Sequence, residues 1–311
     1  MKFFQAKFNI SSKILFAGLL CSATLLTAPL KAAPAIPLQE IKTEIQNYDF
    51  VLVDGFLGDM TKKNFIETRQ EIWKASPRSA TVIIRPASQK TLNRNADELA
   101  QSLKNLKKIK TLNRPLLIYG HSRGSLEILT MLLRQPGLVE ELDIAQVVLI
   151  QGAIQGTQLA DITHAQWVKL CEKNRFTKDS KFCEFSDDFM ATVRNLKVAN
   201  TQRHLRQLLA KLSAKQLEIL DRKVSYVTST GKMKQTHKAL LPSMIYLRMK
   251  AGHNDGIIPT KYQSWGALGK VLLRENSDHL SLLTINKFSP KKEYSFFERV
   301  FQELMNQNRL Q

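Results

Sequence analysis

The sequence predicts an α/β protein with a mostly parallel central sheet, helices on both faces of that sheet, and a helical insertion. Short apolar runs alternate with longer amphipathic stretches from residue 49 onwards, as is typical of strand–helix–strand units. Each run is continuously apolar, which is expected for strands covered on both faces. Strands joined by right-handed helical crossovers lie parallel in one sheet.

The first 35 residues are predicted to form a secretory signal peptide. Lys2, Lys7 and Lys13 precede an apolar run over 14–28. That run is shorter than the ~20 residues that span a bilayer, and small residues over 32–35 mark a cleavage site. We therefore expect an exported protein, periplasmic or secreted, whose domain covers 36–311. The alternative is an uncleaved N-terminal anchor.

Two cysteines, Cys171 and Cys183, would remain after cleavage. An even pair in an oxidising compartment indicates a disulfide. Closing this short loop would stabilise the fold by roughly 3 kcal/mol in the chain-entropy model. Neither cysteine has the spacing of a zinc site or a Cys-x-x-Cys redox pair.

The formal net charge is +19. The basic residues are spread along the chain, and no zinc-finger, basic-zipper or aromatic–basic RNA motif is present, so no nucleic-acid partner is predicted. An exported basic protein would meet anionic membranes and envelope polymers, which makes such a surface a candidate partner. The alternative is an ordinary solvated surface.

The predicted elements follow the apolar pattern in chain order. Strands are expected at 49–56, 81–86, 115–120, 146–152, 224–230, 244–249 and 270–275. The amphipathic stretches between the early strands predict helices at 62–75, 96–110 and 122–134. Residues 160–222 contain helical stretches but no convincing strand, which predicts a cap or lid inserted in the sheet. A last helix within 294–307 carries an apolar face and is expected to dock on the sheet.

The segment GHSRG at 120–124 joins a predicted strand to a predicted helix. Gly-x-Ser-x-Gly alone is a weak signal, expected by chance in about one chain in ten of this length. At a strand-to-helix turn it predicts a strained serine held above the sheet, with Gly120 and Gly124 placed where side chains would collide. Ser122 is therefore the predicted nucleophile, and the helix N-terminus behind it favours an oxyanion. The alternative is an ordinary N-cap serine.

A serine nucleophile needs a histidine base and an acid that orients it, on loops after later strands. His279 follows the predicted strand 270–275 and is the predicted base, because the other histidines lie in the turn, in or near the insertion, or before the acid. Asp255 is the predicted acid, since Gly256 and a nearby proline suit a tight loop that turns the carboxylate inward. Asp278 is the second choice.

A developing negative charge also needs hydrogen-bond donors. The backbone N–H of Arg123, directly after the nucleophile, is one predicted donor. The backbone N–H of Phe56, in the loop after the first strand, is the other. Gly55 and Gly58 would let that backbone approach a substrate; the alternative is a plain strand-to-helix turn.

These motifs resemble those of the secreted bacterial lipases and esterases of the α/β-hydrolase superfamily. VLVDGFLG is similar to their oxyanion segment, with Asp54 where histidine is usual, and GHSRGS to their serine turn. VVLIQGAIQGTQLAD resembles the strand that leads into their cap, with Ile154 and Gln155 where Pro and His are usual. The segment from NDGIIP to SDHLSLL is similar to their acid loop and histidine loop. The resemblance implies an α/β-hydrolase fold and supports the same triad and oxyanion donors.

The reaction predicted is cleavage of carboxylic ester or lipid substrates through an acyl-enzyme. Thioesterases, phospholipases and polyester depolymerases use the same triad and are alternatives, as is a catalytically silent domain that binds an anionic envelope partner. No cofactor is predicted. The family often has an aspartate two residues after the histidine as a calcium ligand, and Ser281 in that place argues against a structural calcium.

Overall fold

The computed structural model of the protein describes residues 36–56, 65–165, 190–283 and 295–310. All of them belong to one compact unit, Ala35–Gln311. The predicted signal peptide over 1–35 and the predicted Cys171–Cys183 disulfide lie outside the described residues and stay predictions.

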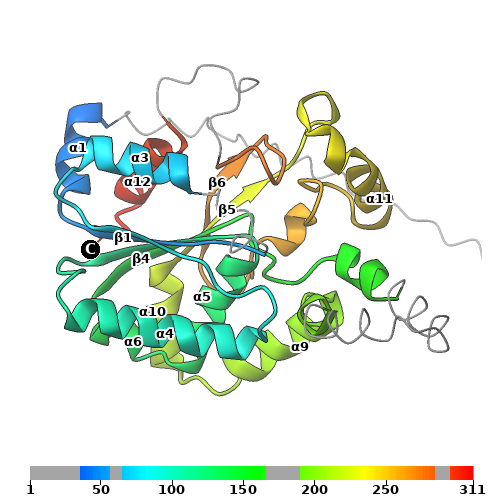
Figure 1. Ribbon diagram of the computed structural model, residues 1–311, viewed down its shortest axis with the longest axis horizontal. Helices are drawn as coiled ribbons and strands as arrows, with labels where there is room; N and C mark the ends of the chain where they lie inside the picture. The colour runs from blue at the N-terminus through cyan, green and yellow to red at the C-terminus, as the bar shows by residue number, and fades with distance from the viewer. Residues whose placement is uncertain (1–35, 57–64, 166–189, 284–294, 311) are drawn as a thin grey trace, which may run out of the picture. The chain divides into compact units, whose positions relative to one another are not determined.

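A six-stranded sheet forms the centre of the described residues, and all of its neighbouring strands are parallel (Figure 1). The strand order is β2-β1-β3-β4-β5-β6, so the direction of winding reverses between β1 and β3. The predicted α/β class and parallel sheet are confirmed. The strands are β1 (Asp49–Val53), β2 (Thr81–Ile84), β3 (Leu116–His121), β4 (Ile144–Ile150), β5 (Val224–Ser229) and β6 (Lys270–Glu275).

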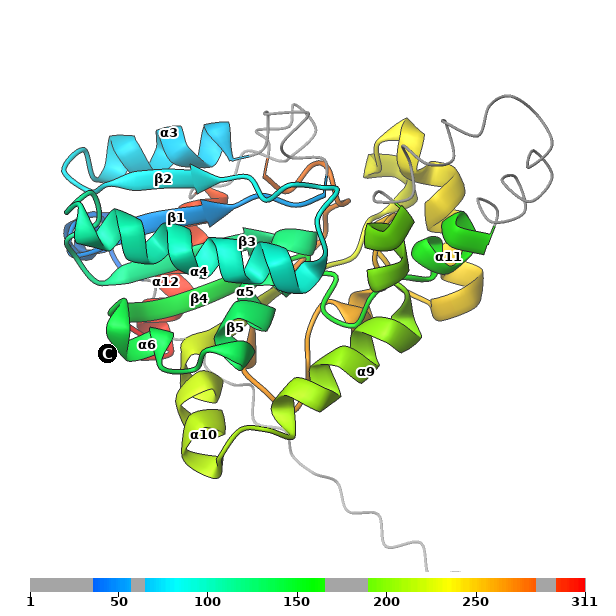
Figure 2. The same ribbon diagram turned by 60° about the horizontal axis from the view of Figure 1, so that its bottom comes forward.

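Helices cover both faces of the sheet, as Figure 2 shows. One face packs against α1 (Leu38–Ile45), α3 (Ile66–Ala75) and α12 (Phe296–Asn306). The opposite face packs against α4 (Leu92–Lys108), α5 (Arg123–Arg134), α6 (Leu138–Glu141), α9 (Val198–Leu209) and α10 (Ala214–Lys223). Three 3₁₀ turns and one further helix lie near the carboxyl ends of the strands: η1 (Met233–Gln235), η2 (Lys238–Leu240), α11 (Leu241–Ala251) and η3 (Thr260–Tyr262).

The strands are apolar without interruption because each one contributes to two separate cores. In β3, Leu116 and Ile118 join the core under α4 and α5, whereas Leu117 and Tyr119 join the core under α3 and α12. Successive side chains of a strand point to opposite faces. A strand covered on both faces therefore needs an apolar residue at every position.

The described part of the 160–222 segment is helical and packs in two places. Leu205 of α9 and Leu220 of α10 belong to the main core on the α5 face of the sheet. Residues nearer the start of the segment form a small separate cluster that includes Ala160 and Met190. The role of this insertion as a lid stays a prediction.

The C-terminal helix docks as predicted. Phe297, Val300, Phe301 and Leu304 of α12 are fully buried in the core on the α1 and α3 face. Among the described helices, none is long and apolar enough to cross a membrane.

The predicted strand at 244–249 is wrong, because these residues lie within helix α11. Met244 and Leu247 are its buried positions, and a spacing of three is helical rather than extended. Pro242 lies in the first turn of the helix and Gly252, at φ +89°, follows its last residue. Both are ordinary helix boundary residues, so the sequence carried a helix-boundary signal on each side of the apolar run.

Candidate active site

Ser122 lies at the turn between β3 and α5, with φ +55° and ψ −124°. Positive φ is costly for a residue with a side chain and persists where the surrounding structure enforces it. The Ser122 N–H donates to the carbonyl of Ile150 in β4 (3.0 Å), and the Ser122 carbonyl accepts from the N–H of Ala153 (3.2 Å). The backbone of the serine is thus tied on both sides to the end of the neighbouring strand.

The glycines around Ser122 are placed where no side chain fits, as predicted. A Cβ on Gly120 would lie 2.9 Å from the backbone of Ser125 in α5. A Cβ on Gly124 would lie 2.4 Å from the carbonyl oxygen of Asp54, at the end of β1. Gly55 is equally tight, because its Cβ would lie 2.8 Å from the Cβ of Ser122. The loop after β1 therefore packs directly onto the serine.

Ser122, His279 and Asp255 lie in a hydrogen-bonded row. Nε2 of His279 is 2.9 Å from Oγ of Ser122, and Nδ1 of His279 is 2.8 Å from Oδ2 of Asp255. Asp255 is fully buried and His279 is 5% exposed, whereas Ser122 is only partly buried. The structure brings together the predicted nucleophile, base and acid at the carboxyl ends of β3, β5 and β6.

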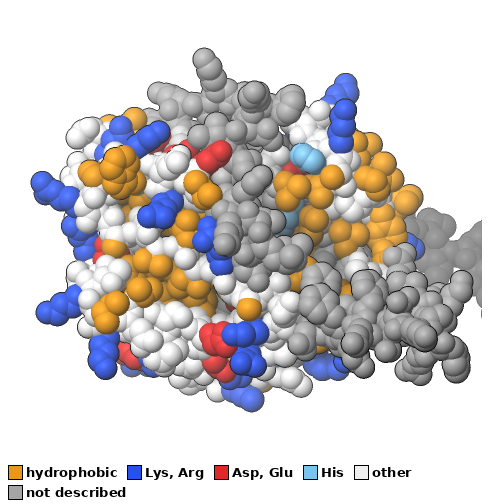
Figure 3. All heavy atoms as spheres, viewed as in Figure 1, with side chains coloured by type: hydrophobic (Ala, Val, Ile, Leu, Met, Phe, Trp, Pro, Cys, Tyr) orange, Lys and Arg blue, Asp and Glu red, His pale blue; other side chains and the backbone are white. Residues whose placement is uncertain are grey.

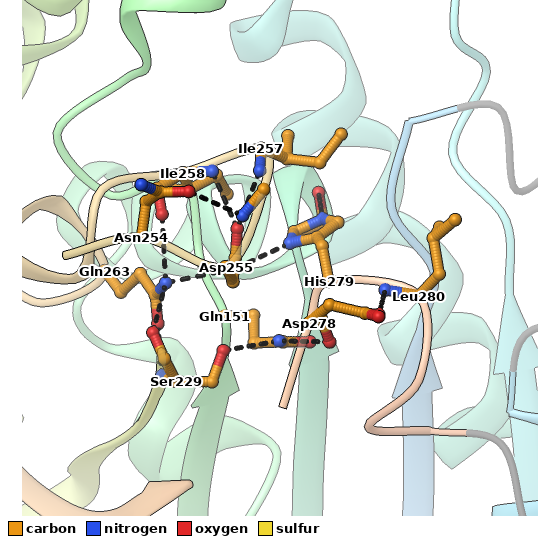
Figure 4. A network of polar contacts seen from close by, with 12 residues as sticks. Gln151, Ser229, Asn254, Asp255, Ile257, Ile258, Gln263, Asp278, His279 and Leu280 are labelled. Atoms are coloured by element: carbon orange, nitrogen blue, oxygen red, sulfur yellow. Dashed lines mark hydrogen bonds and ion pairs between the residues drawn. The ribbon is translucent and has the colours of Figure 1, made fainter. Parts of the chain in front are cut away.

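The Asp255 carboxylate is fixed by two backbone N–H groups that follow it and by the side chain of Gln263, eight residues further on (Figure 4). Its Oδ1 accepts from the N–H groups of Ile257 (2.9 Å) and Ile258 (2.8 Å). Its Oδ2 accepts from Nε2 of the buried Gln263 at 3.0 Å. Gln263 also accepts from the N–H of Ser229 at the end of β5 (2.6 Å). Gln263 therefore ties the acid to the sheet, a role that no sequence motif indicated.

Asp278, the second choice for the acid, serves the backbone instead. Its Oδ1 accepts from the N–H groups of Leu280 (2.9 Å) and Ser281 (2.8 Å), and its Oδ2 accepts from the N–H of His237 (2.7 Å). The carboxylate shapes the histidine loop and joins it to the start of η2. The imidazole of His279 pairs with Asp255.

His121 and Gln151 form a second buried layer behind the row. The His121 ring lies 4.8 Å from the His279 ring, centroid to centroid, and its Nε2 is 3.2 Å from Oε1 of Gln151. Gln151 in turn donates to Oγ of Ser229 (2.5 Å) and to the carbonyl of Asp278 (3.0 Å; Figure 4). Burial, with the nearby His279 as a smaller cause, lowers the pKa of His121 to about 3. His121 is therefore a neutral neighbour of His279 at ordinary pH.

The side chain of Arg123 anchors the start of α5. It is 3% exposed, and its Nε is 2.9 Å from Oε1 of Glu127. Its guanidinium donates to the carbonyls of Ser88 (3.1 Å) and Lys90 (2.6 Å) after β2, while Asn95 of α4 donates to Glu127 (2.7 Å). The pair thus joins α5 to the segment after β2 and to α4, and a buried ion pair is by itself weak evidence for stability. No sequence motif indicated this pair.

Phe56 and Arg123, the two predicted oxyanion donors, lie beside each other. The Arg123 guanidinium carbon is 5.8 Å from the centre of the Phe56 ring. Phe56 also packs against the small cluster of the insertion, formed by Ala160, Met190 and Val193. The start of the helical insertion thus contacts the loop that follows β1.

Within the described ranges, no group of three or more His, Cys, Asp and Glu side chains could hold a metal ion.

No family model matches the chain, and no curated protein matches it in sequence. Solved structures do match. A metagenomic carboxyl esterase is similar with a TM-score of 0.60 at 19% identity, over 84% of this chain and 75% of that chain. The mature form of a Bacillus licheniformis lipase is similar with a TM-score of 0.53 at 16% identity, over 85% of this chain and 90% of that chain. At these identities the likeness concerns the fold, which is the α/β-hydrolase fold.

Proposed function

We propose that the protein is a serine hydrolase that cleaves carboxylic esters, with Ser122 as nucleophile, His279 as base and Asp255 as the acid that orients the base. The observation that carries the proposal is the row of 2.9 Å and 2.8 Å contacts from the Ser122 hydroxyl through His279 to Asp255. The two similar structures are those of a carboxyl esterase and a lipase, which supports an ester substrate.

In this mechanism Oγ of Ser122 attacks the ester carbonyl carbon as Nε2 of His279 takes its proton. The imidazolium that forms is stabilised by the Asp255 carboxylate. The oxygens of that carboxylate accept hydrogen bonds from the N–H groups of Ile257 and Ile258 and from the side chain of Gln263. The carbonyl π electrons move to oxygen, and we assign that oxyanion to the backbone N–H groups of Phe56 and Arg123. Collapse of the tetrahedral intermediate breaks the ester bond, and the alcohol leaves with the proton from His279.

Water then clears the acyl-enzyme by the same steps. His279 takes a proton from the water, the hydroxide attacks the acyl carbonyl, and Ser122 leaves with the proton. The close approach of Gly55 to Ser122 supports the assignment of the β1 loop to the oxyanion, since a side chain there would push the loop away. No metal or organic cofactor is required by these steps.

The test is covalent labelling with a fluorophosphonate, together with hydrolysis of a series of ester chain lengths. We expect a single labelled peptide that contains Ser122. Substitution of Ser122 by Ala should lower kcat/KM about 10⁴-fold or more. The matched control is Ser125→Ala, because Ser125 is the next serine along the chain, in α5, and its hydroxyl donates to the backbone carbonyl of Gly120. Full ester hydrolysis by Ser122→Ala would contradict the proposal.

We also propose that residues 1–35 export the protein to the periplasm or the medium and that Cys171 and Cys183 pair there. The basic start, the short apolar run and the small residues over 32–35 support this assignment. Expression of the full chain in a bacterial host should yield a processed protein whose N-terminus lies near residue 36. Intact residues 1–35 on the recovered protein would contradict cleavage.

A further inference from the structure

The segment 230–253, which joins β5 to the Asp255 loop and contains η1, η2 and α11, carries a net positive charge. It has no Asp or Glu, and its five basic residues are all exposed. Exposed positive charges gathered in one acid-free segment attract anionic surfaces. The basic residues are Lys232, Lys234, Lys238, Arg248 and Lys250.

The same segment exposes large apolar side chains. Met233 is 47% exposed, Ile245 is 45% and Met249 is 75%. Met244 and Leu247 are buried, so α11 carries apolar residues on its solvent side as well as on its packed side. Figure 3 shows hydrophobic side chains gathered on the side of the molecule where Figure 1 places α11.

The segment lies directly against the candidate active site. The N–H of His237 donates to Asp278, which precedes His279, at 2.7 Å. The hydroxyl of Ser243 donates to the carbonyl of Gly256, which follows Asp255, at 2.6 Å. Leu280, directly after His279, is a further large apolar residue and is 47% exposed. A surface that binds this segment would therefore meet the edge of the site.

We propose that segment 230–253 is a docking surface for an anionic phospholipid bilayer. Exposed apolar side chains set among lysines and arginines are the chemistry of an interfacial helix, which inserts its apolar side chains at the headgroup level while its cations pair with lipid phosphates. A soluble polyanion would satisfy the cations and leave the methionines in water. The purpose of the docking rests on the proposed function: it places Ser122 close to lipid esters.

Hydrogen exchange on the full chain tests the docking locally, so that binding by residues 1–35 cannot be mistaken for it. Amides of 230–253 should exchange more slowly on vesicles that contain phosphatidylglycerol than on phosphatidylcholine vesicles. This difference between the two vesicle types should become smaller at high salt. Residues 104–110 are the internal control, because they carry four lysines and the exposed Ile109 at the opposite ends of the strands. Protection of 104–110 in place of 230–253, or equal protection of 230–253 by soluble polyphosphate, would overturn the proposal.

Paired variants test the consequence. The double variant Ile245→Ser/Met249→Ser should lower hydrolysis of esters embedded in anionic vesicles about tenfold and leave hydrolysis of a soluble short-chain ester unchanged. The matched control is Ile109→Ser. Ser122→Ala should lose both activities and keep the exchange protection, so failure of the proposed function is distinguished from failure of the docking. Unchanged vesicle hydrolysis and protection in the double variant would overturn the docking surface.

Discussion

Ser122 is held in place by close backbone packing and backbone hydrogen bonds, whereas Asp255 and His279 are held by hydrogen bonds that involve their side chains. On the serine side, Gly55, Gly120 and Gly124 allow β1, β3 and α5 to approach within distances that exclude a Cβ. On the other side, the carboxylate depends on a glutamine side chain and two amide groups. The serine side should therefore tolerate no added atom, while the acid side should tolerate changes that preserve its hydrogen bonds.

The largest effect is expected on the serine side. Gly124→Ala would place a Cβ 2.4 Å from the carbonyl oxygen of Asp54, and backbone cannot rotate away as a side chain can. We expect the free energy of unfolding to fall by about 3 kcal/mol, measured by urea denaturation. Gly137→Ala is the control, because a Cβ there meets nothing within 4 Å, and it should change stability by less than about 1 kcal/mol. Equal losses in the two variants would show that packing at the turn is not the cause.

A second effect concerns His121, the residue before Ser122, whose ring lies 4.8 Å from the ring of His279, centroid to centroid. Its pKa is about 3 in the folded protein, below the ordinary 6.5, so the unfolded chain binds a proton that the native state excludes. The contribution of His121 to the free energy of unfolding should therefore be complete above pH 6.5. It should fall as the pH drops towards 3, by up to about 1.4 kcal/mol per pH unit.

Replacement of His121 by Gln removes that titration. The slope of the free energy of unfolding between pH 6 and pH 4 should become shallower by about 1 kcal/mol per unit, measured by urea denaturation across pH. His253→Gln is the control, since His253 is exposed, and its slope should match that of the parent chain. An unchanged slope in His121→Gln would mean that this imidazole protonates in the native state.

The smallest effect is expected at Gln263, on the acid side. Gln263→Met keeps the volume and removes the donor to Asp255, so we expect kcat to fall about tenfold with little change in KM, because the side chain lies behind the acid. Gln155→Met is the control: its Nε2 donates to the carbonyls of Lys261 (3.2 Å) and Ser264 (2.8 Å) in the same loop but not to Asp255. A similar loss of kcat in both variants would mean that Gln263 acts only through the stability of the loop.

The serine turn could be predicted from sequence because all of its determinants are local. The strand 116–121, the helix 123–134 and the two glycines lie within one short stretch, and each has a direct steric meaning. Asp255 and His279 could be selected as well, because parallel strands bring their carboxyl ends to one edge of the sheet and chain order then limits the choice. Helix α11 was missed because a short apolar run fits a strand or a helix equally well.

The sequence by itself determined the fold class, the strands covered on both faces and the identity of the residues that meet at the sheet edge. It could do so because apolar periodicity and the glycines and prolines of turns depend only on neighbouring residues. Only the tertiary structure decided which polar side chains support them. Gln263 is 34 residues from Ser229, and Gln151 is 127 residues from Asp278. Nothing in the local pattern separates these two glutamines from solvated ones. Their role comes from the fold, which buries both side chains and brings them within hydrogen-bond distance of Ser229 at the end of β5, because buried polar groups need partners.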